Sequence, residues 1–165
     1  MGPLMGRIPL RFNEMKRHFS LTAGIALGRP GMGPNASLGT WLRNEFIFDT
    51  GTTTTSIAEE VAERLGVDVE KLALVDVGGV TGVAKRPFLP EVDIWFLGDD
   101  FQGVRLSGVV VLRILREKRR EQKSGVRQER IVRLPALNLL GLDAVEALGA
   151  RVTFDFKKKA GWIEW

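Results

Sequence analysis

The sequence predicts an all-β domain with two short helices. Runs of apolar and β-branched residues, bounded by Gly, Pro, Asn or Asp, recur along the 165-residue chain, whereas apolar residues at helical spacing occur in two short segments. The length suits one domain, and the 44% apolar and 27% charged residues are typical of a globular protein that buries a core. Strands are therefore expected to dominate the fold.

The chain begins with a segment of no clear periodicity, residues 1–18, which we expect to form an N-terminal arm ahead of a domain at 19–165. A mildly alternating strand at 19–27 leads into residues 28–39, where the density of Gly and Pro predicts a long hairpin loop rather than a phosphate-binding loop. The next strand, 41–48, ends in residues that are apolar on both faces, as in a strand buried on both sides.

The first helical segment follows a run of threonines. Its apolar residues between 57 and 65 share one face of a helix, and Gly66 is expected to cap the C-terminus. A strand-like segment at 72–77 then runs into Gly-Gly-Val-Thr-Gly, which predicts a glycine-rich hairpin.

The next extended segment, residues 83–96, contains Pro87 and Pro90, which favour a strand at the edge of a sheet. Residues 97–103 form a predicted turn, so the two aspartates within it are interpreted as turn residues rather than metal ligands. A strand rich in β-branched residues is expected at 104–115.

A charged insertion is expected at residues 116–130. Nine Lys or Arg stand against three Glu between Arg113 and Arg133, a local charge of +6 in a chain of net charge +4. Such a run cannot bury itself, which predicts a solvated helix or a mobile loop between two strands. Because no aromatic residue is interleaved to stack on bases, a nucleic-acid interface is the weaker hypothesis for this segment.

The C-terminal part repeats the order of strand and helix. A buried strand ends at residues 139–141, and apolar residues at helical spacing over 142–148 predict the second helix, with a glycine cap. Residues 152–157 alternate as in a half-buried strand, to which 162–165 could return antiparallel.

Missing residue types exclude much of enzyme chemistry. There is no Cys, and the chain has one histidine, His18, so the usual zinc sets cannot be assembled within one chain and a Ser-His triad would have to use that residue. We expect neither a metal nor another cofactor. No apolar run approaches the about 20 residues of a membrane-spanning helix, and no signal peptide is recognised, which predicts a cytoplasmic protein without membrane contact.

The stretch Glu-Phe-Ile-Phe-Asp-Thr-Gly-Thr-Thr-Thr-Thr-Ser, residues 45–56, ends an apolar strand on the carboxylate of Asp49. Burial of a charge costs free energy unless another group pairs with it or neutralises it. About 90 residues later, Asn-Leu-Leu-Gly-Leu-Asp-Ala-Val-Glu-Ala-Leu-Gly places an apolar-apolar-Gly strand before the second helix. With the glycine-rich hairpin between them, these elements resemble the retropepsin-like aspartic proteases, the single-domain relatives of pepsin, over about residues 19–157.

The resemblance implies a closed-barrel-like fold and a homodimeric aspartic endopeptidase that hydrolyses a peptide or protein substrate. Two carboxylates that lie close share one proton, because like charges so near cannot both ionise, and the pair can then activate water and also protonate the leaving amine. The chain has one Asp-Thr-Gly motif, so the second carboxylate must come from Asp49 of a second copy.

By the same resemblance, Asp49 is catalytic, Thr50 bonds to the opposite chain, and Gly51 lets backbone amides approach the carboxylates. Leu140 and Gly141 support this loop from behind. The flap that closes over an extended substrate comprises Gly78, Gly79, Val80, Thr81 and Gly82.

Three threonines, Thr52, Thr53 and Thr54, depart from the family pattern, in which Ala commonly follows the glycine and viral members then carry Asp residues that grip the substrate backbone. Whether the dimer forms through terminal strands or through the C-terminal hairpin at 154–165 stays open.

The principal alternative is a catalytically silent module of the same fold that dimerises or binds peptides. Asp49 would then serve as a helix cap, and the glycine-rich hairpin would be an inert turn.

Overall fold

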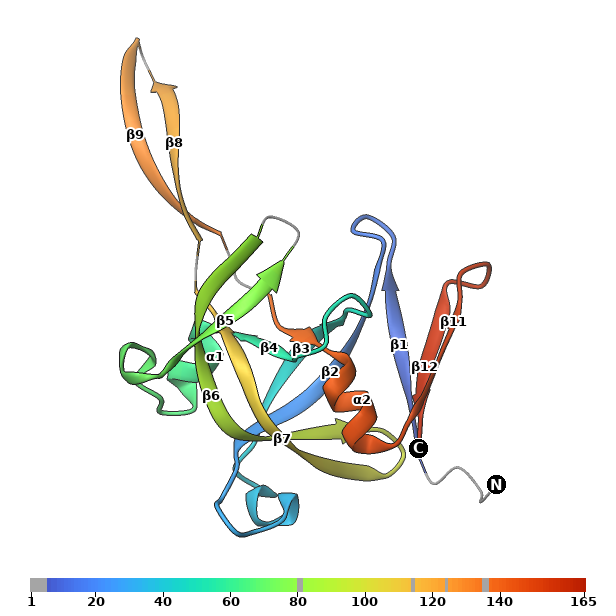
Figure 1. Cartoon of the computed structure of the whole chain (residues 1–165). Helices are drawn as coiled ribbons and strands as arrows, with labels where there is room; N and C mark the ends of the chain where they lie inside the picture. The colour runs from blue at the N-terminus through green and yellow to red at the C-terminus, as the bar shows by residue number, and fades with distance from the viewer. Residues whose placement is uncertain (1–5, 80–81, 114, 124, 135–136) are drawn as a thin grey trace.

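A computed structural model describes residues 6–79, 82–113, 115–123, 125–134 and 137–165 of the chain. It confirms that strands dominate and that two short α-helices accompany them (Figure 1). In chain order the elements are β1 (Arg7–Asn13), β2 (His18–Leu27), the 3₁₀ helix η1 (Pro34–Ser37), β3 (Leu42–Phe48), β4 (Ser56–Ala58), α1 (Glu59–Arg64), the 3₁₀ helix η2 (Val69–Lys71), β5 (Leu74–Gly79), β6 (Gly82–Leu97), β7 (Phe101–Leu112), β8 (Leu115–Lys123), β9 (Val126–Leu134), β10 (Leu139–Leu140), α2 (Leu142–Leu148), β11 (Arg151–Asp155) and β12 (Ala160–Glu164).

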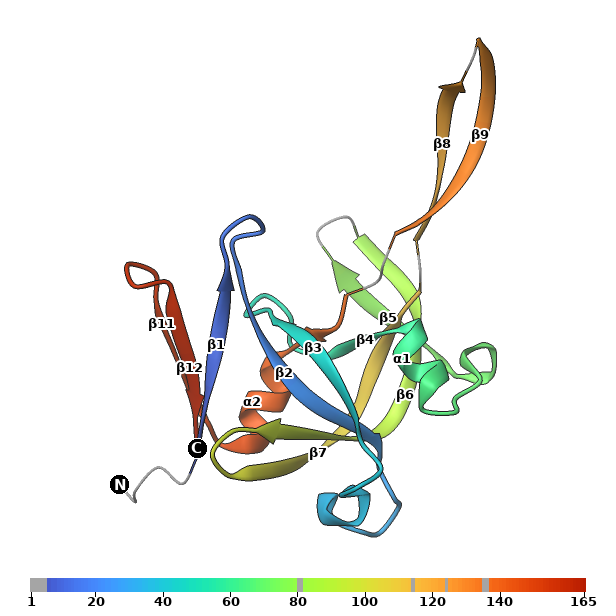
Figure 2. The same cartoon turned by 180° about the vertical axis from the view of Figure 1, so that it is seen from behind.

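The strands of the body close on themselves. β2 pairs with β3, β3 with β10, β10 with β4, β4 with β7, β7 with β6, and β6 again with β2. A sheet whose two ends meet in this way is a barrel, which confirms the closed-barrel-like prediction. β5 extends this sheet beyond β6, while β1, β12 and β11 extend it beyond β2 (Figures 1 and 2).

The core lies inside the barrel and is built from alternate residues of its strands. Phe46 of β3, Phe96 of β6 and Ile25 of β2 are all 0% exposed. Each apolar side chain buried to this extent contributes about 1.5–3 kcal/mol to folding. The strand that leads to Asp49 is therefore anchored in the buried core through Phe46 and Phe48.

The described part of the N-terminal segment forms a strand of the sheet. The prediction of an N-terminal arm was therefore wrong for these residues. β1 pairs with both β12 and β2, and its alternate residues Ile8 and Leu10 are buried, with 5% and 4% exposure. The backbones of Gly6 and Trp165 also exchange hydrogen bonds of 2.8 and 3.0 Å. The alternation in β1 is short and interrupted by Pro9, which is why the sequence showed no clear period there.

The prediction that β6 lies at a sheet edge was also wrong. β7 lines one side of β6, while the other side pairs first with β5, as far as Pro87, and then with β2, from Val92 onward. Pro90 and Glu91 lie between those two ladders, and Glu91 has a φ of 51°. The prolines therefore lie at the change of partner: Pro87 is the last residue of β6 that pairs with β5, and Pro90 lies between the β5 and β2 ladders.

The charged insertion forms a β-hairpin rather than a helix or a loop. β8 and β9 pair in register from Leu115 opposite Leu134 to Lys123 opposite Val126. Within the described chain they form a separate two-stranded sheet, and Figures 1 and 2 show it projecting away from the barrel. The charge count alone could not distinguish a hairpin from a helix or a loop.

The long loop between β2 and β3 is confirmed, and buried polar groups hold it against the barrel. The indole N–H of Trp95 donates to the hydroxyl of Ser37 at 3.0 Å. Arg105 forms an ion pair with Asp93, which is 0% exposed, and also donates to the carbonyl of Met32 at 2.8 Å. The hydrogen bond with the Asp93 side chain is the main reason that the pKa of Arg105 is raised.

Both predicted helices are present, and glycines in the left-handed region follow them, with φ of 84° at Gly66 and 65° at Gly149. α1 begins two residues later than expected because Ile57 and Ala58 belong to β4. None of the helices in the described part of the chain has the length and apolar character needed to cross a bilayer.

Candidate active site

Asp49 directly follows β3, and the neighbouring strand β10 fixes its backbone. The N–H of Ile47 donates to the carbonyl of Asn138 at 2.9 Å, and the N–H of Asp49 donates to the carbonyl of Leu140 at 3.1 Å. Leu140 is 0% exposed, and the preceding Phe48 is 7% exposed. Asp49 thus stands at the tip of a buried parallel strand pair.

The carboxylate of Asp49 is oriented from within its own loop. Its Oδ1 accepts a hydrogen bond from the N–H of Gly51 at 2.8 Å. A Cβ at Gly51 would lie 3.1 Å from that oxygen, so a side chain there would crowd the contact. Asp49 itself is half-buried and Thr50 is exposed, so both are accessible in the single chain.

Asp49 does not cap the helix that follows it. α1 begins at Glu59, and its N-cap is Ala58, which makes no side-chain cap bond. The capping alternative raised by the sequence is therefore wrong. The carboxylate instead belongs to the loop at 49–55, which we name the Asp49 loop.

The far end of the Asp49 loop is fastened by two residues whose roles sequence reasoning missed, Thr55 and Asp143. Thr55 is 0% exposed. Its N–H donates to both Asp143 oxygens at 3.0 Å, and its hydroxyl donates to Oδ1 at 2.7 Å. The same hydroxyl accepts from the N–H of Gly141 at 3.0 Å. Neither residue stands out in the sequence, because Asp143 looks like an ordinary acid in the first turn of a helix.

The start of α2 also contacts the middle of the Asp49 loop through its backbone. The N–H of Leu142 donates to the carbonyl of Thr52 at 3.1 Å, and that of Asp143 donates to the carbonyl of Thr53 at 3.0 Å. A Cβ at Gly141 would lie 2.8 Å from the backbone of Thr54 and Thr55. Leu140 and Gly141 therefore lie next to the Asp49 loop, Leu140 through its hydrogen bond with Asp49 and Gly141 through its close contact with Thr54 and Thr55.

Asn138 is a further residue that sequence reasoning missed. Its side-chain amide donates to the carbonyl of Glu45 at 3.0 Å and accepts from the N–H of Ala58 at 2.8 Å. One side chain thus joins β3 to the end of β4. Its signal was a single polar residue within the apolar run before Gly141.

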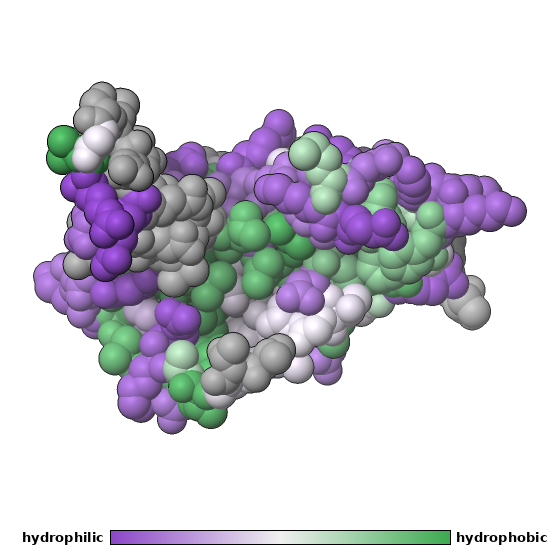
Figure 3. Space-filling view, turned by 90° about the horizontal axis from the view of Figure 1, so that it is seen from above, coloured by the Kyte–Doolittle hydropathy of each residue, from purple (hydrophilic) through white to green (hydrophobic). Residues whose placement is uncertain are grey.

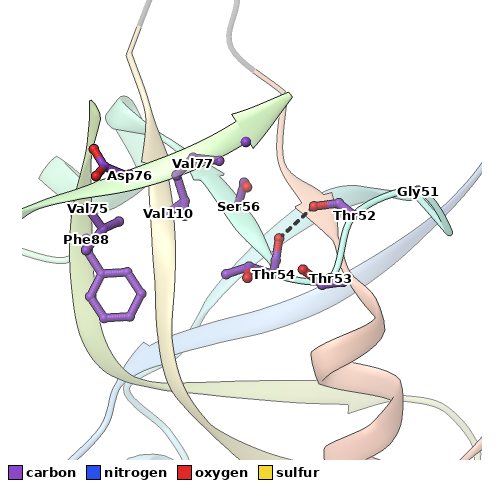
Figure 4. A pocket seen from close by; sticks show the side chains of 11 residues that line it. Gly51, Thr52, Thr53, Thr54, Ser56, Val75, Asp76, Val77, Phe88 and Val110 are labelled. Carbon is purple, nitrogen blue, oxygen red and sulfur yellow. Dashed lines mark hydrogen bonds between the residues drawn. The ribbon is translucent and has the colours of Figure 1, made fainter. Parts of the chain in front are cut away.

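A cavity of about 310 Å³ lies between the Asp49 loop and β5 (Figure 4). β5 and β6 form the glycine-rich hairpin, with Gly79 opposite Gly82, while Val80 and Thr81 lie outside the described residues. The lining residues are Gly51, Thr52, Thr53, Thr54, Ser56, Val75, Asp76, Val77, Gly78, Phe88 and Val110.

This cavity has two chemically different walls. Figure 4 shows the threonines of the Asp49 loop and Ser56 on one side, and the valines of β5 with Phe88 on the other. On the threonine side, the hydroxyl of Thr52 donates to the carbonyl of Thr54 at 3.1 Å and so stabilises the conformation of the loop. Asp76 at the rim pairs with Lys85 at 2.9 Å. Within the described residues no group of three or more His, Cys, Asp or Glu could hold a metal ion.

A family model described as aspartyl protease matches residues 39–144, which is more than half of the chain. The structure is similar to the crystal structure of a retropepsin-like aspartic protease from Rickettsia conorii, with a TM-score of 0.59 and 18% identity over 100% of this chain and 97% of that chain. EIAV protease complexed with the inhibitor HBY-793 matches with a TM-score of 0.41 and 17% identity, over 86% of this chain and 98% of that chain. A search of curated proteins finds no match.

The matched residues include the Asp49 loop, the glycine-rich hairpin and the start of α2, and the barrel is the fold shared with the Rickettsia enzyme. The chain therefore belongs to the aspartyl protease family, and its fold is retropepsin-like.

Proposed function

We propose that this chain is a homodimeric aspartic endopeptidase in which the Asp49 carboxylates of two copies activate a water molecule. The observation that carries the proposal is the placement of Asp49, half-buried at the tip of the β3–β10 pair and oriented by the N–H of Gly51 at 2.8 Å. Such a carboxylate is rigid and accessible, but it is only one of the two that the reaction needs. The chain has one Asp-Thr-Gly motif, so a second copy must provide the other.

The chemistry follows from two carboxylates that share one proton. The ionised Asp49 removes a proton from water as the water oxygen bonds to the carbonyl carbon of the substrate. The protonated Asp49 of the other copy gives its proton to the carbonyl oxygen, which yields a tetrahedral diol. As the diol breaks down and the carbon–nitrogen bond cleaves, the Asp49 that took the proton from water gives it to the leaving nitrogen. The ionised Asp49 of the other copy takes a proton from a diol hydroxyl, so the pair again holds one shared proton.

An extended peptide fits the surroundings of Asp49. β5 ends the strand order of the large sheet, so one of its edges has no strand partner among the described residues, and its valines line the cavity beside the Asp49 loop. A peptide lying along that edge would form backbone hydrogen bonds like an added strand. We assign flap roles to Gly78, Gly79, Val80, Thr81 and Gly82 on this basis. Thr50 is assigned to the bond between the two Asp49 loops.

The test is cleavage of an unfolded protein by the full chain, compared with Asp49→Asn. The variant should lose at least about 1,000-fold in kcat/KM, because it lacks the carboxylate pair. A statine-containing inhibitor should block the wild type. Asp100→Asn, in an exposed turn, is the matched control and should retain full activity.

Specific activity should also rise with protein concentration, because each site needs two chains. If wild type and Asp49→Asn are equally inert as confirmed dimers from acidic to neutral pH, the chain is instead a silent dimerisation or peptide-binding module.

A further inference from the structure

Five phenylalanines form a continuous aromatic cluster beside the Asp49 loop. Phe19 of β2 has its ring centroid 5.0 Å from that of Phe12, 4.8 Å from Phe154 and 5.6 Å from Phe156. Phe48, the residue before Asp49, lies 5.6 Å from Phe154. The phenylalanine cluster therefore reaches from the end of the catalytic strand to β11.

The cluster is buried at one end and open at the other. Phe19 and Phe48 are 5% and 7% exposed, whereas Phe156 is 70% exposed although neighbouring rings hold it in place. Met15, in the turn between β1 and β2, is 96% exposed, and an ion pair of 2.6 Å between Glu14 and Lys159 ties that turn to the one after Phe156. A large ring that is already ordered and still exposed can bind a partner with little further loss of entropy.

This open end faces the same way as the Asp49 loop. The β1–β2 turn, the β11–β12 turn and the loop after β3 lie at one end of the molecule in both Figure 1 and Figure 2. Looking onto that end, Figure 3 shows patches of hydrophobic surface among hydrophilic side chains. The exposed Met15 and Phe156 are flanked in the chain by the exposed charged residues Glu14, Lys16 and Lys157. An apolar centre within a polar rim is the usual anatomy of a protein interface.

The last strand of the chain, β12, has no free edge to offer a second copy. β12 lies between β1 and β11 in the sheet, so its two edges are both paired within the chain. β11, by contrast, is the last strand of the sheet on this side and has one neighbour among the described strands. The unused edge and the exposed ring are therefore adjacent, at β11 and Phe156.

We propose that the phenylalanine cluster, with Phe156 at its exposed end, is the surface on which a second copy of this chain docks. The inference rests on the proposed function, which needs a second Asp49 within reach of the first. A two-fold contact uses the same patch on both copies, and an apolar patch is complementary to itself. Continuity through Phe48 means that docking at the cluster also orders the strand end that carries Asp49.

The experiment compares Phe156→Ser with Phe101→Ser in the full chain. Phe101 is the matched control, since it is 54% exposed and begins β7, next to the β6–β7 turn at the opposite end of the molecule (Figure 1). Sedimentation velocity over a range of concentrations gives the dimer dissociation constant, and peptide cleavage is measured on the same samples. Phe156→Ser should raise the constant at least about tenfold, with activity regained at high protein concentration, whereas Phe101→Ser should change neither. Phe156→Trp should retain the dimer.

The possible failures can be told apart. If wild type cleaves peptides and Phe156→Ser dimerises as tightly as wild type, the docking surface is wrong and the protease assignment stands. If dimerisation depends on Phe156 but wild type cleaves nothing, the docking surface stands and the protease assignment is wrong. A wild type that stays monomeric at every concentration overturns the docking surface.

Discussion

Thr55 donates to the carboxylate of Asp143 through both its backbone N–H, at 3.0 Å, and its hydroxyl, at 2.7 Å, across 88 residues of sequence. The Asp143 Oδ1 also accepts from the N–H of Ala144 at 2.8 Å, so one carboxylate organises both the end of the Asp49 loop and the first turn of α2. This contact couples the candidate catalytic loop to a distant part of the chain.

Asp143→Ala should destabilise the protein by about 2–3 kcal/mol, because it leaves the buried N–H and hydroxyl of Thr55 without their charged acceptor. Urea denaturation measures the loss. Asp143→Asn should destabilise the protein less than Asp143→Ala, because the amide keeps one acceptor oxygen for Thr55. Some loss is still expected, since its N–H₂ group then faces a donor. Asp100→Ala is the control in an exposed turn and should change stability by less than about 0.5 kcal/mol. Equal stability of Asp143→Ala and wild type would show that this carboxylate does not hold the loop.

Gly141→Ala should destabilise the protein by about 1–3 kcal/mol and lower cleavage activity, because the added Cβ would meet the backbone of Thr54 and Thr55 at 2.8 Å. Those atoms belong to the Asp49 loop and can yield only if the loop moves. Gly33→Ala is the matched control, since a Cβ there meets nothing within 4 Å and its φ of −72° suits any residue. Thermal unfolding of the two variants compares them directly, and similar melting temperatures would contradict the packing argument.

Much of the fold could be predicted because its signals are local. Both helices have apolar residues at helical spacing and a glycine just after the last turn, and most strands lie between obvious turn formers. The Asp49 motif was recognisable because a carboxylate after an apolar strand is costly unless it has a special role. The strand at 139–140 behind it was recognisable because an apolar pair ended at a glycine.

What the sequence could not predict depends on partners that are far away in the chain. β1 is too short and too interrupted to be recognised without β12, the strand that covers it. In the sequence, Pro87 and Pro90 look like signals of an edge strand. Only the fold reveals that the partner of β6 changes from β5 to β2 between Pro87 and Val92. Thr55 and Asp143 form one structural unit, but neither residue alone differs from an ordinary helix-flanking polar residue.

Deletion of the β8–β9 hairpin, residues 115–134, should leave the barrel intact. Its two strands pair only with each other among the described strands, and β7 and β10 on either side of it are separated by β4, a span of about 10 Å that a Gly-Ser linker of about six residues can bridge. We expect thermal stability within about 0.5 kcal/mol of wild type and unchanged cleavage of a short peptide, because neither the cavity nor the Asp49 loop uses hairpin residues. The deletion also tests the nucleic-acid hypothesis: salt-sensitive binding of RNA or DNA by wild type that disappears with the hairpin would support it. A deletion variant that fails to fold, or that loses peptide cleavage while remaining folded, would show that the hairpin is part of the working enzyme.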